Sequence, residues 1–205
     1  KLDGKKTGVL HMNGSFTTVT YYDHYGICGS ITNFAEVNIR NTNENPAENH
    51  NQIVLGDYGK STPTFSATVL NMDDDTELSF YTSDMKAKLS VTDLNVSNGL
   101  IYVEGTVAIK NLNMDGETEL DAFRNMTLTN VTLNGMPRIR GYREFTISGN
   151  VTSNTGNAVL RSAQKSASNR TPYLNIKGDV ILANDACKIG VVVDDYMDID
   201  LPKLE

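Results

Sequence analysis

The stretch Leu89–Val96, Leu-Ser-Val-Thr-Asp-Leu-Asn-Val, has three related copies further along the chain. They follow at nearly even spacing, at Val107–Met114, Met126–Leu133 and Phe145–Val151. Each copy has two apolar residues in alternation, then an Asn, Asp or Gly; in the first three copies a second alternating apolar pair follows. A repeat of about 20 residues built from short alternating strands is typical of a β-solenoid.

A second internal match supports the same period. Leu70–Leu78 and Leu112–Leu120 are identical at seven of nine positions. The distance between them equals two repeats plus a short insertion, for which Ser83–Lys86 is the candidate. The match predicts that the two segments occupy the same place in the repeat, two turns apart.

The alternation within a repeat predicts three sides and three corners. Leu89 and Val91 point inward, Ser90 and Thr92 point outward, and a residue that tolerates left-handed or bridge backbone follows. This first corner is expected at Asp93, Asn111, Asn130 and Gly149. A wider corner is expected at Asn98–Gly99, Asp115–Gly116 and Asn134–Gly135, and the third side at Ile101/Val103, Leu120/Ala122 and Ile139. We therefore predict an all-β fold, a single-stranded right-handed parallel β-helix with about 18–19 residues per rung and loop excursions.

The chain is expected to form one domain, residues 1–205. Residues 1–30 are the least repetitive and are interpreted as an N-terminal cap of irregular strands with a turn at Asn13–Gly14. Rungs are expected over residues 31–193. Within them, the polar segment 41–51 is expected to be a loop, and the basic, Ser-rich segment 161–170 a loop or short helix. Residues 194–205 are interpreted as an acidic tail that caps the last rung.

Composition excludes some classes of partner. A formal charge of −7 and a pI near 5.0 argue against nucleic acid and anionic membranes as partners. No apolar run approaches the ~20 residues of a membrane-spanning helix. Cys28 and Cys187 would lie near opposite ends of a solenoid, too far apart for a disulfide, and are interpreted as free thiols. The abundance of Asn, Thr, Ser and Gly favours an extracellular or cell-surface location.

Acidic corners are the candidate catalytic residues under an enzyme hypothesis. They are Asp73, Asp74, Asp75, Asp115 and Glu117, which the repeat places at one corner two rungs apart. That is roughly 10 Å along the axis at ~4.8 Å per rung, close to the ~6.5–9.5 Å between the carboxylates of inverting glycosidases. The corner between them offers only Ser97, Asn98 and Gly99, which favours the alternative that these acids are solvated turn residues. A second alternative is an adventitious Ca²⁺ site.

Two other groups are candidates for ligand binding. One is the compact segment Tyr21, Tyr22, Asp23, His24 and Tyr25, whose rings can stack on a sugar while its polar groups bind hydroxyls. The alternative is a capping loop over the first rung. The other group is Arg138, Arg140 and Arg143, a basic strip in an acidic chain, with Arg138 and Arg140 on one face of a strand. These arginines would meet an acidic glycan or pair with nearby acids.

Metal and cofactor sites are not predicted. His11, His24 and His50 lack the spacing of a metal site, and no phosphate-binding glycine loop or nucleophile motif occurs. We expect no metal, no cofactor and, on balance, no enzymatic activity.

The rungs over residues 65–193 resemble the pectin-lyase-like parallel β-helix, and in particular the non-enzymatic repeats of large bacterial cell-surface and adhesin proteins. The resemblance rests on the repeat and not on a signature motif. It implies a secreted or surface-displayed module with an adhesive or structural role that binds a glycan or a host or cell-surface protein. Members with lyase or hydrolase activity carry clustered Asp, Arg or Lys on one solvent-facing sheet. Here the outward positions are interpreted as mostly Ser, Thr, Asn and Lys, so no catalytic residue is carried over.

Two alternatives follow from the same resemblance. A polysaccharide lyase or hydrolase would use the acidic corners, and a phage tailspike-like protein would be a homotrimer that recognises surface polysaccharide. Otherwise a monomer is expected. A spacer rod without a ligand is the third reading.

Overall fold

The computed structural model describes residues 1–14, 16–17, 26–27, 29–41, 49–56, 62–73, 76–163 and 173–194. Within these ranges the chain is all β, with no helix. The strands are β1 (Leu2–Asp3), β2 (Val9–Gly14), β3 (Phe16–Thr17), β4 (Gly26–Ile27), β5 (Ile31–Asn41), β6 (Asn49–Leu55), β7 (Thr64–Met72), β8 (Thr76–Phe80), β9 (Ala87–Ser97), β10 (Leu100–Val103), β11 (Gly105–Asp115), β12 (Glu119–Ala122), β13 (Met126–Gly135), β14 (Arg138–Gly141), β15 (Glu144–Ile147), β16 (Val151–Ala163), β17 (Tyr173–Ile176), β18 (Val180–Leu182) and β19 (Lys188–Asp194).

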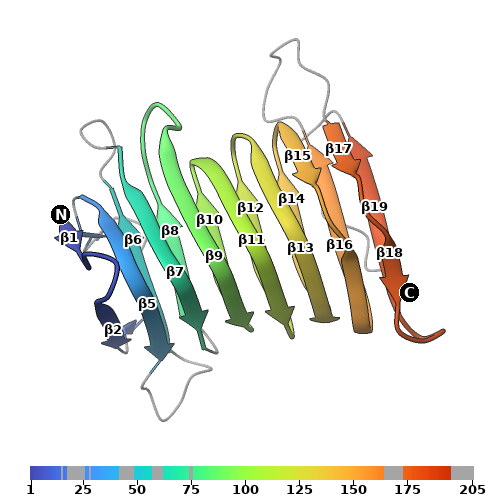
Figure 1. The fold of residues 1–205 in the computed structure, drawn as a ribbon, viewed down its shortest axis with the longest axis horizontal. Coiled ribbons are helices and arrows are strands. Elements are labelled where there is room, and N and C mark those ends of the chain that lie inside the picture. The colour runs from blue at the N-terminus through green and yellow to red at the C-terminus, as the bar shows by residue number, and fades with distance from the viewer. Residues whose placement is uncertain are drawn as a thin grey trace.

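Long strands stack in parallel along the molecule and form what we call the long-strand sheet (Figure 1). Its order is β1 and β2, then β5, β7, β9, β11, β13, then β15 with the first half of β16, and last β17 and β18. Leu89 lies opposite Val107, which lies opposite Met126, so the repeat predicted from the sequence is the ladder register itself.

The first predicted corner is a bend within each long strand. In β9 the buried residues are Leu89 and Val91, then Leu94 and Val96, so the alternation shifts by one residue around Thr92. Polar side chains stack along this bend: Asn111 Nδ2 donates to Asp93 Oδ1 at 2.7 Å, and Asn130 Nδ2 donates to Asn111 Oδ1 at 3.0 Å. These bonds satisfy the side chains that the bend turns outward, so the two predicted sides form one bent strand.

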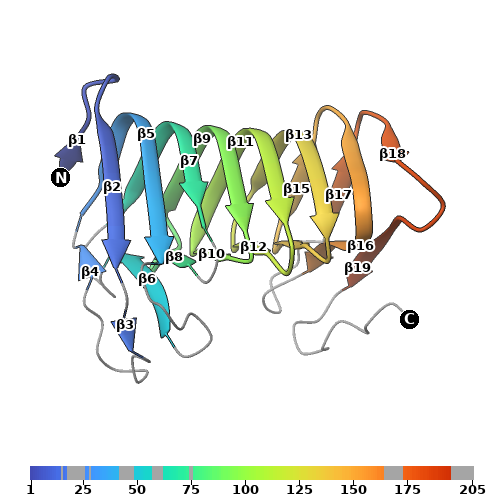
Figure 2. The same cartoon turned by 90° about the horizontal axis from the view of Figure 1, so that it is seen from below.

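Short strands form the third side, which we call the short-strand sheet. Its parallel order is β4, β6, β8, β10, β12, β14, the second half of β16, and β19. Figure 2 shows the long strands curving across one side and β8, β10 and β12 closing the turn behind them. Strand β16 belongs to both sheets, because Val151 pairs with β13 and Leu160 pairs with β14. The predicted parallel β-helix is thereby confirmed.

Inward side chains form columns that run along the axis. One column consists of Leu10, Val37, Leu70, Leu94, Leu112, Val131, Val151 and Val180, each opposite the next across a parallel ladder. The members from Val37 to Val151 are buried in one continuous apolar core. Burial of such columns is the main stabilising contribution in a repeat fold, since each rung covers only its neighbours.

The wider corner uses left-handed backbone. Asn98, Gly116, Gly135 and Gly156 have φ of 44°, 70°, 83° and 74°. At Gly156 an added Cβ would collide with the backbone carbonyl oxygen of Gly135, so close stacking of rungs requires glycine there. The prediction of a corner in these segments is confirmed, although in the first of them Asn98 and not Gly99 adopts the left-handed conformation.

Three local predictions are wrong. Asn13 and Gly14 do not form a turn but end β2, where they pair in parallel with β5. An Asn-Gly pair forms a hairpin turn when the two strands that it joins pair with each other. Here the strand that pairs with β2 is β5, from the next rung. Residues 49–51, expected in a loop, begin β6, and residues 161–163 are not a loop or helix but the end of β16. Asn41, expected in the same loop as residues 49–51, is the last residue of β5. The remainder of these two segments, 42–48 and 164–170, lies outside the described residues.

The ends of the solenoid extend the ladder in both directions. β1 and β2 pair with β5 at one end, and β17, β18 and β19 form the last rung at the other. Cys187 is buried and free, as predicted, whereas Cys28 lies outside the described residues. The expected tail cap, residues 194–205, is described only at Asp194, the last residue of β19.

Candidate ligand-binding site

The outer face of the short-strand sheet carries charged and aromatic side chains in register. One outward column runs Glu77, Leu100, Glu119, Arg138 and Val159. The next runs Ser79, Tyr102, Asp121, Arg140 and Arg161. The interpretation that outward positions are mostly Ser, Thr, Asn and Lys is therefore wrong for this sheet. We call Tyr102, Glu119, Asp121, Arg138, Arg140, Tyr142 and Arg161 the charged strip.

Two acid–arginine pairs bridge neighbouring strands in this strip. Arg138 Nη1 donates to Glu119 Oε1 at 3.0 Å, and both side chains are partly exposed. Arg140 Nε lies 3.6 Å from Asp121 Oδ1, in a more buried position. Arg140 Nε is buried and has no hydrogen-bond partner among the described residues, so its contact with Asp121 is electrostatic. Of the two alternatives for these arginines, the structure shows pairing with neighbouring acids.

Burial dominates the ionisation of Asp121. Its side chain is buried, and this burial raises its pKa to about 6, against the opposing charges of Arg140 and Arg161. For Arg140, burial acts to lower the pKa, but the charge of Asp121 and the hydrogen bond to Tyr142 outweigh it, and the net pKa is raised. Burial, together with the charge of Asp121, raises the pKa of Tyr142. The strip thus places a carboxyl that titrates near pH 6 beside permanent cations.

Four aromatic rings stack along the axis beside these charges. The ring centroids of Tyr81 and Tyr102 are 5.4 Å apart, those of Tyr102 and Phe123 4.7 Å, and those of Phe123 and Tyr142 4.4 Å. Phe123 and Tyr142 are buried in a small apolar cluster separate from the solenoid core, whereas Tyr81 and Tyr102 are half-buried. Arg140 Nη1 donates to the Tyr142 hydroxyl at 2.9 Å, which ties the stack to the charged strip.

The insertion predicted at Ser83–Lys86 forms a turn next to this stack. Glu104 Oε2 accepts a hydrogen bond from the backbone N–H of Thr82 at 2.7 Å, and Arg124 Nη2 donates to the carbonyl oxygen of Asp84 at 3.1 Å. Met85 packs against the aromatic cluster. The turn is therefore held by residues of the next two rungs.

The acidic corner has a different environment. Asp73 follows Met72, which lies opposite Val96, and Asp115 lies opposite Ser97, so the two carboxylates share one corner two rungs apart as predicted. Arg40 Nε pairs with Asp73 Oδ2 at 3.3 Å, and Asp115 Oδ1 accepts from the N–H of Gly116 at 2.9 Å. Glu117 is exposed, and Asp74 and Asp75 lie outside the described residues. Exposed carboxylates that bond to turn backbone fit the interpretation as turn residues.

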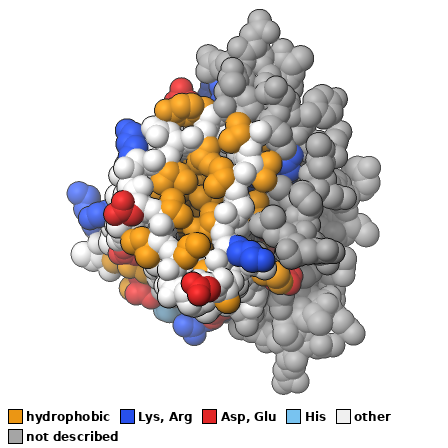
Figure 3. Space-filling model, turned by 90° about the vertical axis from the view of Figure 1, so that its right-hand side faces the viewer, with side chains coloured by type: hydrophobic (Ala, Val, Ile, Leu, Met, Phe, Trp, Pro, Cys, Tyr) orange, Lys and Arg blue, Asp and Glu red, His pale blue; other side chains and the backbone are white. Residues whose placement is uncertain are grey.

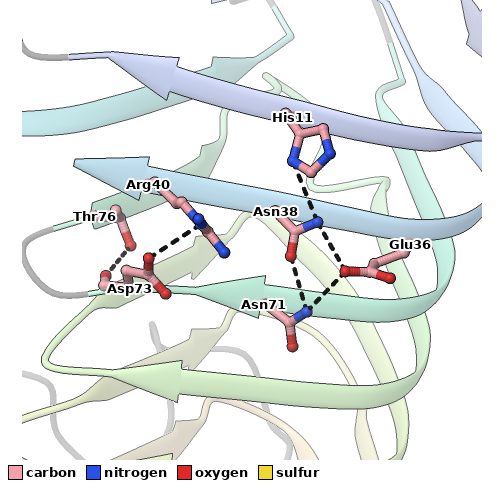
Figure 4. A network of polar contacts seen from close by, with 7 residues as sticks. All are labelled: His11, Glu36, Asn38, Arg40, Asn71, Asp73 and Thr76. Atoms are coloured by element: carbon pink, nitrogen blue, oxygen red, sulfur yellow. Dashed lines mark hydrogen bonds and ion pairs between the residues drawn. The ribbon is translucent and has the colours of Figure 1, made fainter. Parts of the chain in front are cut away.

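A ladder of asparagines runs over the outer face of the long-strand sheet. Asn71 donates to Asn38, Asn95 to Asn71, and Asn113 to Asn95, at Nδ2–Oδ1 distances of 2.9 Å, 2.9 Å and 2.8 Å. Figure 4 shows its N-terminal end, where Asn38 also contacts His11 Nδ1 at 3.5 Å and donates to Glu36 Oε1 at 2.8 Å. Stacked amides of this kind stabilise a parallel ladder. His11 thus contributes to a polar network of the sheet.

Two groups of sequence-predicted site residues remain, the tyrosine-rich segment and Arg143. Tyr21, Tyr22, Asp23, His24 and Tyr25 lie outside the described residues. The carbonyl oxygen of Arg143 accepts a hydrogen bond from Ser162 Oγ at 3.4 Å. The residues that sequence reasoning missed are Tyr102, Glu119, Asp121, Tyr142 and Arg161. The pattern Glu-Leu-Asp-Ala at 119–122, with apolar residues alternating inward, was the available signal.

Within the described ranges no group of three or more His, Cys, Asp or Glu side chains is placed to hold a metal ion. No helix there is long and apolar enough to cross a membrane. Compared with family models, curated proteins and solved structures, the chain matches none of the three.

Proposed function

We propose that this protein is a glycan-binding β-helix module, displayed outside the cell, whose ligand lies along the partly exposed members of the charged strip, Tyr102, Glu119 and Arg138. The observation that carries the proposal is the half-buried ring of Tyr102 on β10. The neighbouring strand β12 carries Asp121 opposite this ring and, two residues earlier, Glu119, which pairs with Arg138. Half-buried rings present apolar faces that pack on sugar rings, and an adjacent carboxylate and guanidinium bind hydroxyls or acidic groups.

The two sheets differ in a way that favours the short-strand sheet as the binding face. In the long-strand sheet, the outward column Ser90, Ala108 and Thr127 is small and uncharged, and the charges on β9 and β11 that flank it are the exposed lysines Lys88 and Lys110. Outward positions of the short-strand sheet combine rings, acids and arginines within neighbouring strands. Specific recognition of a polar ligand needs convergent polar groups on a rigid support, which the parallel ladder provides.

The experiment measures retention of the chain on a panel of neutral and acidic polysaccharides, and counts new chain ends in the same samples. Retention without new ends supports the proposal. Tyr102→Ala should weaken retention, while Tyr173→Ala, the same change on the outer face of the long-strand sheet, should not. Loss of retention in both variants, or no retention on any polymer by the unmodified chain, would contradict the proposal.

Polysaccharide cleavage is the second candidate function, and the pKa of Asp121 near 6 favours it. Glu119 and Asp121 are two residues apart on one face of a strand, so their Cα atoms are separated by about 6.6 Å. Inverting glycosidases use one protonated and one ionised carboxyl about 6.5–9.5 Å apart. The small exposed fraction of Asp121 argues against access by a polymer.

Cleavage would appear as new chain ends with one polymer of the panel. Asp121→Asn should then abolish the new ends, whereas Asp115→Asn at the acidic corner should leave them. The opposite result would assign the activity to the corner residues Asp73, Asp115 and Glu117. Absence of new ends with every polymer would leave binding as the function.

A further inference from the structure

The last rung leaves apolar side chains uncovered. Val180, Leu182, Val191 and Val193 point in the inward directions set by earlier rungs, yet they are 51%, 48%, 56% and 55% exposed. Figure 3 shows apolar side chains gathered on this end of the molecule. Contiguous apolar surface of this kind on an otherwise polar chain marks an interaction surface.

These residues are the ends of the core columns. Val180 lies opposite Val151, and Leu182 lies opposite Ser153, which lies opposite Leu133. On the short-strand sheet, Val191 lies opposite Leu160. Val151, Leu133 and Leu160 are fully buried because a further rung covers each of them. Val180, Leu182 and Val191 lack that covering rung among the described residues.

The N-terminal end presents the other ends of the same columns. Leu10 begins the column that ends at Val180, and Met12 begins the column that ends at Leu182. Both are half-buried, whereas Val37 and Ile39 in the next rung are fully buried. Leu2 likewise begins the column that ends at Leu174 and is 42% exposed.

We propose that the β17–β19 rung of one molecule stacks on the β1–β2 rung of a second copy of this chain, head to tail. The apolar columns would then continue across the contact, with Val180 against Leu10 and Leu182 against Met12. The backbone geometry agrees, because β2 and β18 each pair with one strand only among the described strands and all the pairs of the long-strand sheet are parallel. A parallel strand of the second copy would continue this ladder across the contact.

Charge also favours the contact between unlike ends. The first six residues contain Lys1, Lys5 and Lys6 with a single Asp3, and all four are exposed. The last rung, residues 173–194, carries Asp179, Asp185 and Asp194 against Lys177 and Lys188, a formal charge of −1. Like ends would bring like charges together, whereas unlike ends bring opposite charges together.

In a head-to-tail dimer, one copy still has an uncovered β1–β2 rung and the other copy still has an uncovered β17–β19 rung. Such a heterologous interface extends into an open chain of molecules unless the rotation between copies closes a ring. This distinguishes it from a two-fold dimer, in which the same surface meets itself. The proposal concerns assembly and does not depend on the glycan-binding function.

The test is sedimentation velocity of the chain over a range of concentrations in reducing buffer. The weight-average mass should rise with concentration beyond that of a dimer. Leu182→Lys should reduce it to the mass of one chain, because it places a charge in the contact. Ile181→Lys, the adjacent and similarly exposed residue on the outer face of the same strand, should leave the rise unchanged.

Mixing two blocked variants tests the polarity of the contact. Leu182→Lys blocks the C-terminal end and Leu10→Lys blocks the N-terminal end, so each alone should stay monomeric. An equimolar mixture has one intact end of each kind and should form a dimer and stop there. The proposal would be overturned if the wild type keeps the mass of one chain at all concentrations. It would also be overturned if the mixture stays monomeric while the wild type associates. Circular dichroism checks that each variant is folded.

Discussion

Asp121 and Arg140 lie directly opposite each other on β12 and β14, with Oδ1 and Nε 3.6 Å apart. The distance is too long for a hydrogen bond, so the arginine charge only partly offsets the burial of the carboxylate. Ionised Asp121 is therefore a cost to the folded state. This destabilising carboxylate lies in the sheet that we propose binds a ligand. Ionisable groups with perturbed pKa values are often found at functional sites.

The pH dependence of stability should report this cost. The pKa of Asp121 is about 6 in the folded chain and about 3.9 in the unfolded chain. The folded state thus binds more protons between these values, and the free energy of unfolding should fall as pH rises through about 4 to 6. The loss is at most about 3 kcal/mol at about 1.4 kcal/mol per pKa unit.

Denaturant unfolding of the wild type and Asp121→Asn at several pH values checks this expectation. Asparagine cannot ionise, so the variant should lack this decline and should equal or exceed the wild type in stability above pH 7. Other carboxylates titrate in the same range, and the difference between the two proteins removes their contribution. Parallel curves for the two proteins would contradict the assignment.

The asparagine ladder should stabilise the fold unevenly along its length. Asn71 Nδ2 donates to Asn38 Oδ1, and Asn71 Oδ1 accepts from Asn95 Nδ2, each at 2.9 Å. Asn71→Ala removes these two bonds and a longer one from Asn71 Nδ2 to Glu36 Oε1 at 3.5 Å. It leaves the buried amide of Asn38 without one donor, at a cost of about 1–3 kcal/mol. Asn113→Ala, at the exposed end of the ladder, should cost less than about 1 kcal/mol. Equal costs in chemical denaturation would show that the ladder bonds contribute nothing beyond surface contacts.

Position along a core column should determine the cost of removing a side chain. Leu133 and Leu182 occupy the same column, but Leu133 is fully buried and Leu182 is 48% exposed. Leu133→Ala should lower the free energy of unfolding by about 2–5 kcal/mol through lost burial and a cavity. Leu182→Ala should lower it by less than about 1 kcal/mol at concentrations where the chain is monomeric. Similar costs at both positions would mean that the last rung is covered in solution.

The fold was predictable because its determinants are local and repeated. Leu89, Val107 and Met126 each begin the same pattern of alternating apolar residues, and they lie opposite one another in the ladder. The repeat of about 18–19 residues therefore predicts the strands, the register between them and the core residues together. The departures occur where the repeat is broken: Asn13–Gly14 resembles a hairpin turn but pairs with the next rung, and Arg161 follows the last regular apolar pair of its strand.

The candidate site was predicted less well. Arg138 and Arg140 were identified from their charge, but Asp121 and Glu119 were passed over because their alternation is confined to one short strand. The aromatic stack was missed because its rings come from different positions in the rung. Tyr102 lies within β10, opposite Asp121, whereas Phe123 and Tyr142 follow the last residues of β12 and β14. Contacts between side chains of neighbouring rungs become visible only when the register of the rungs is known.

The affinity of Tyr102→Ala for a polysaccharide that retains the wild type tests the central claim most directly. Isothermal titration with a soluble fragment of that polymer gives the dissociation constant of the wild type, Tyr102→Ala and the control Tyr173→Ala. Loss of a stacking ring should weaken binding about tenfold or more, equivalent to about 1.4 kcal/mol, while the control binds as the wild type does. An unchanged dissociation constant for a folded Tyr102→Ala would contradict the claim that the glycan lies along the outer face of the short-strand sheet.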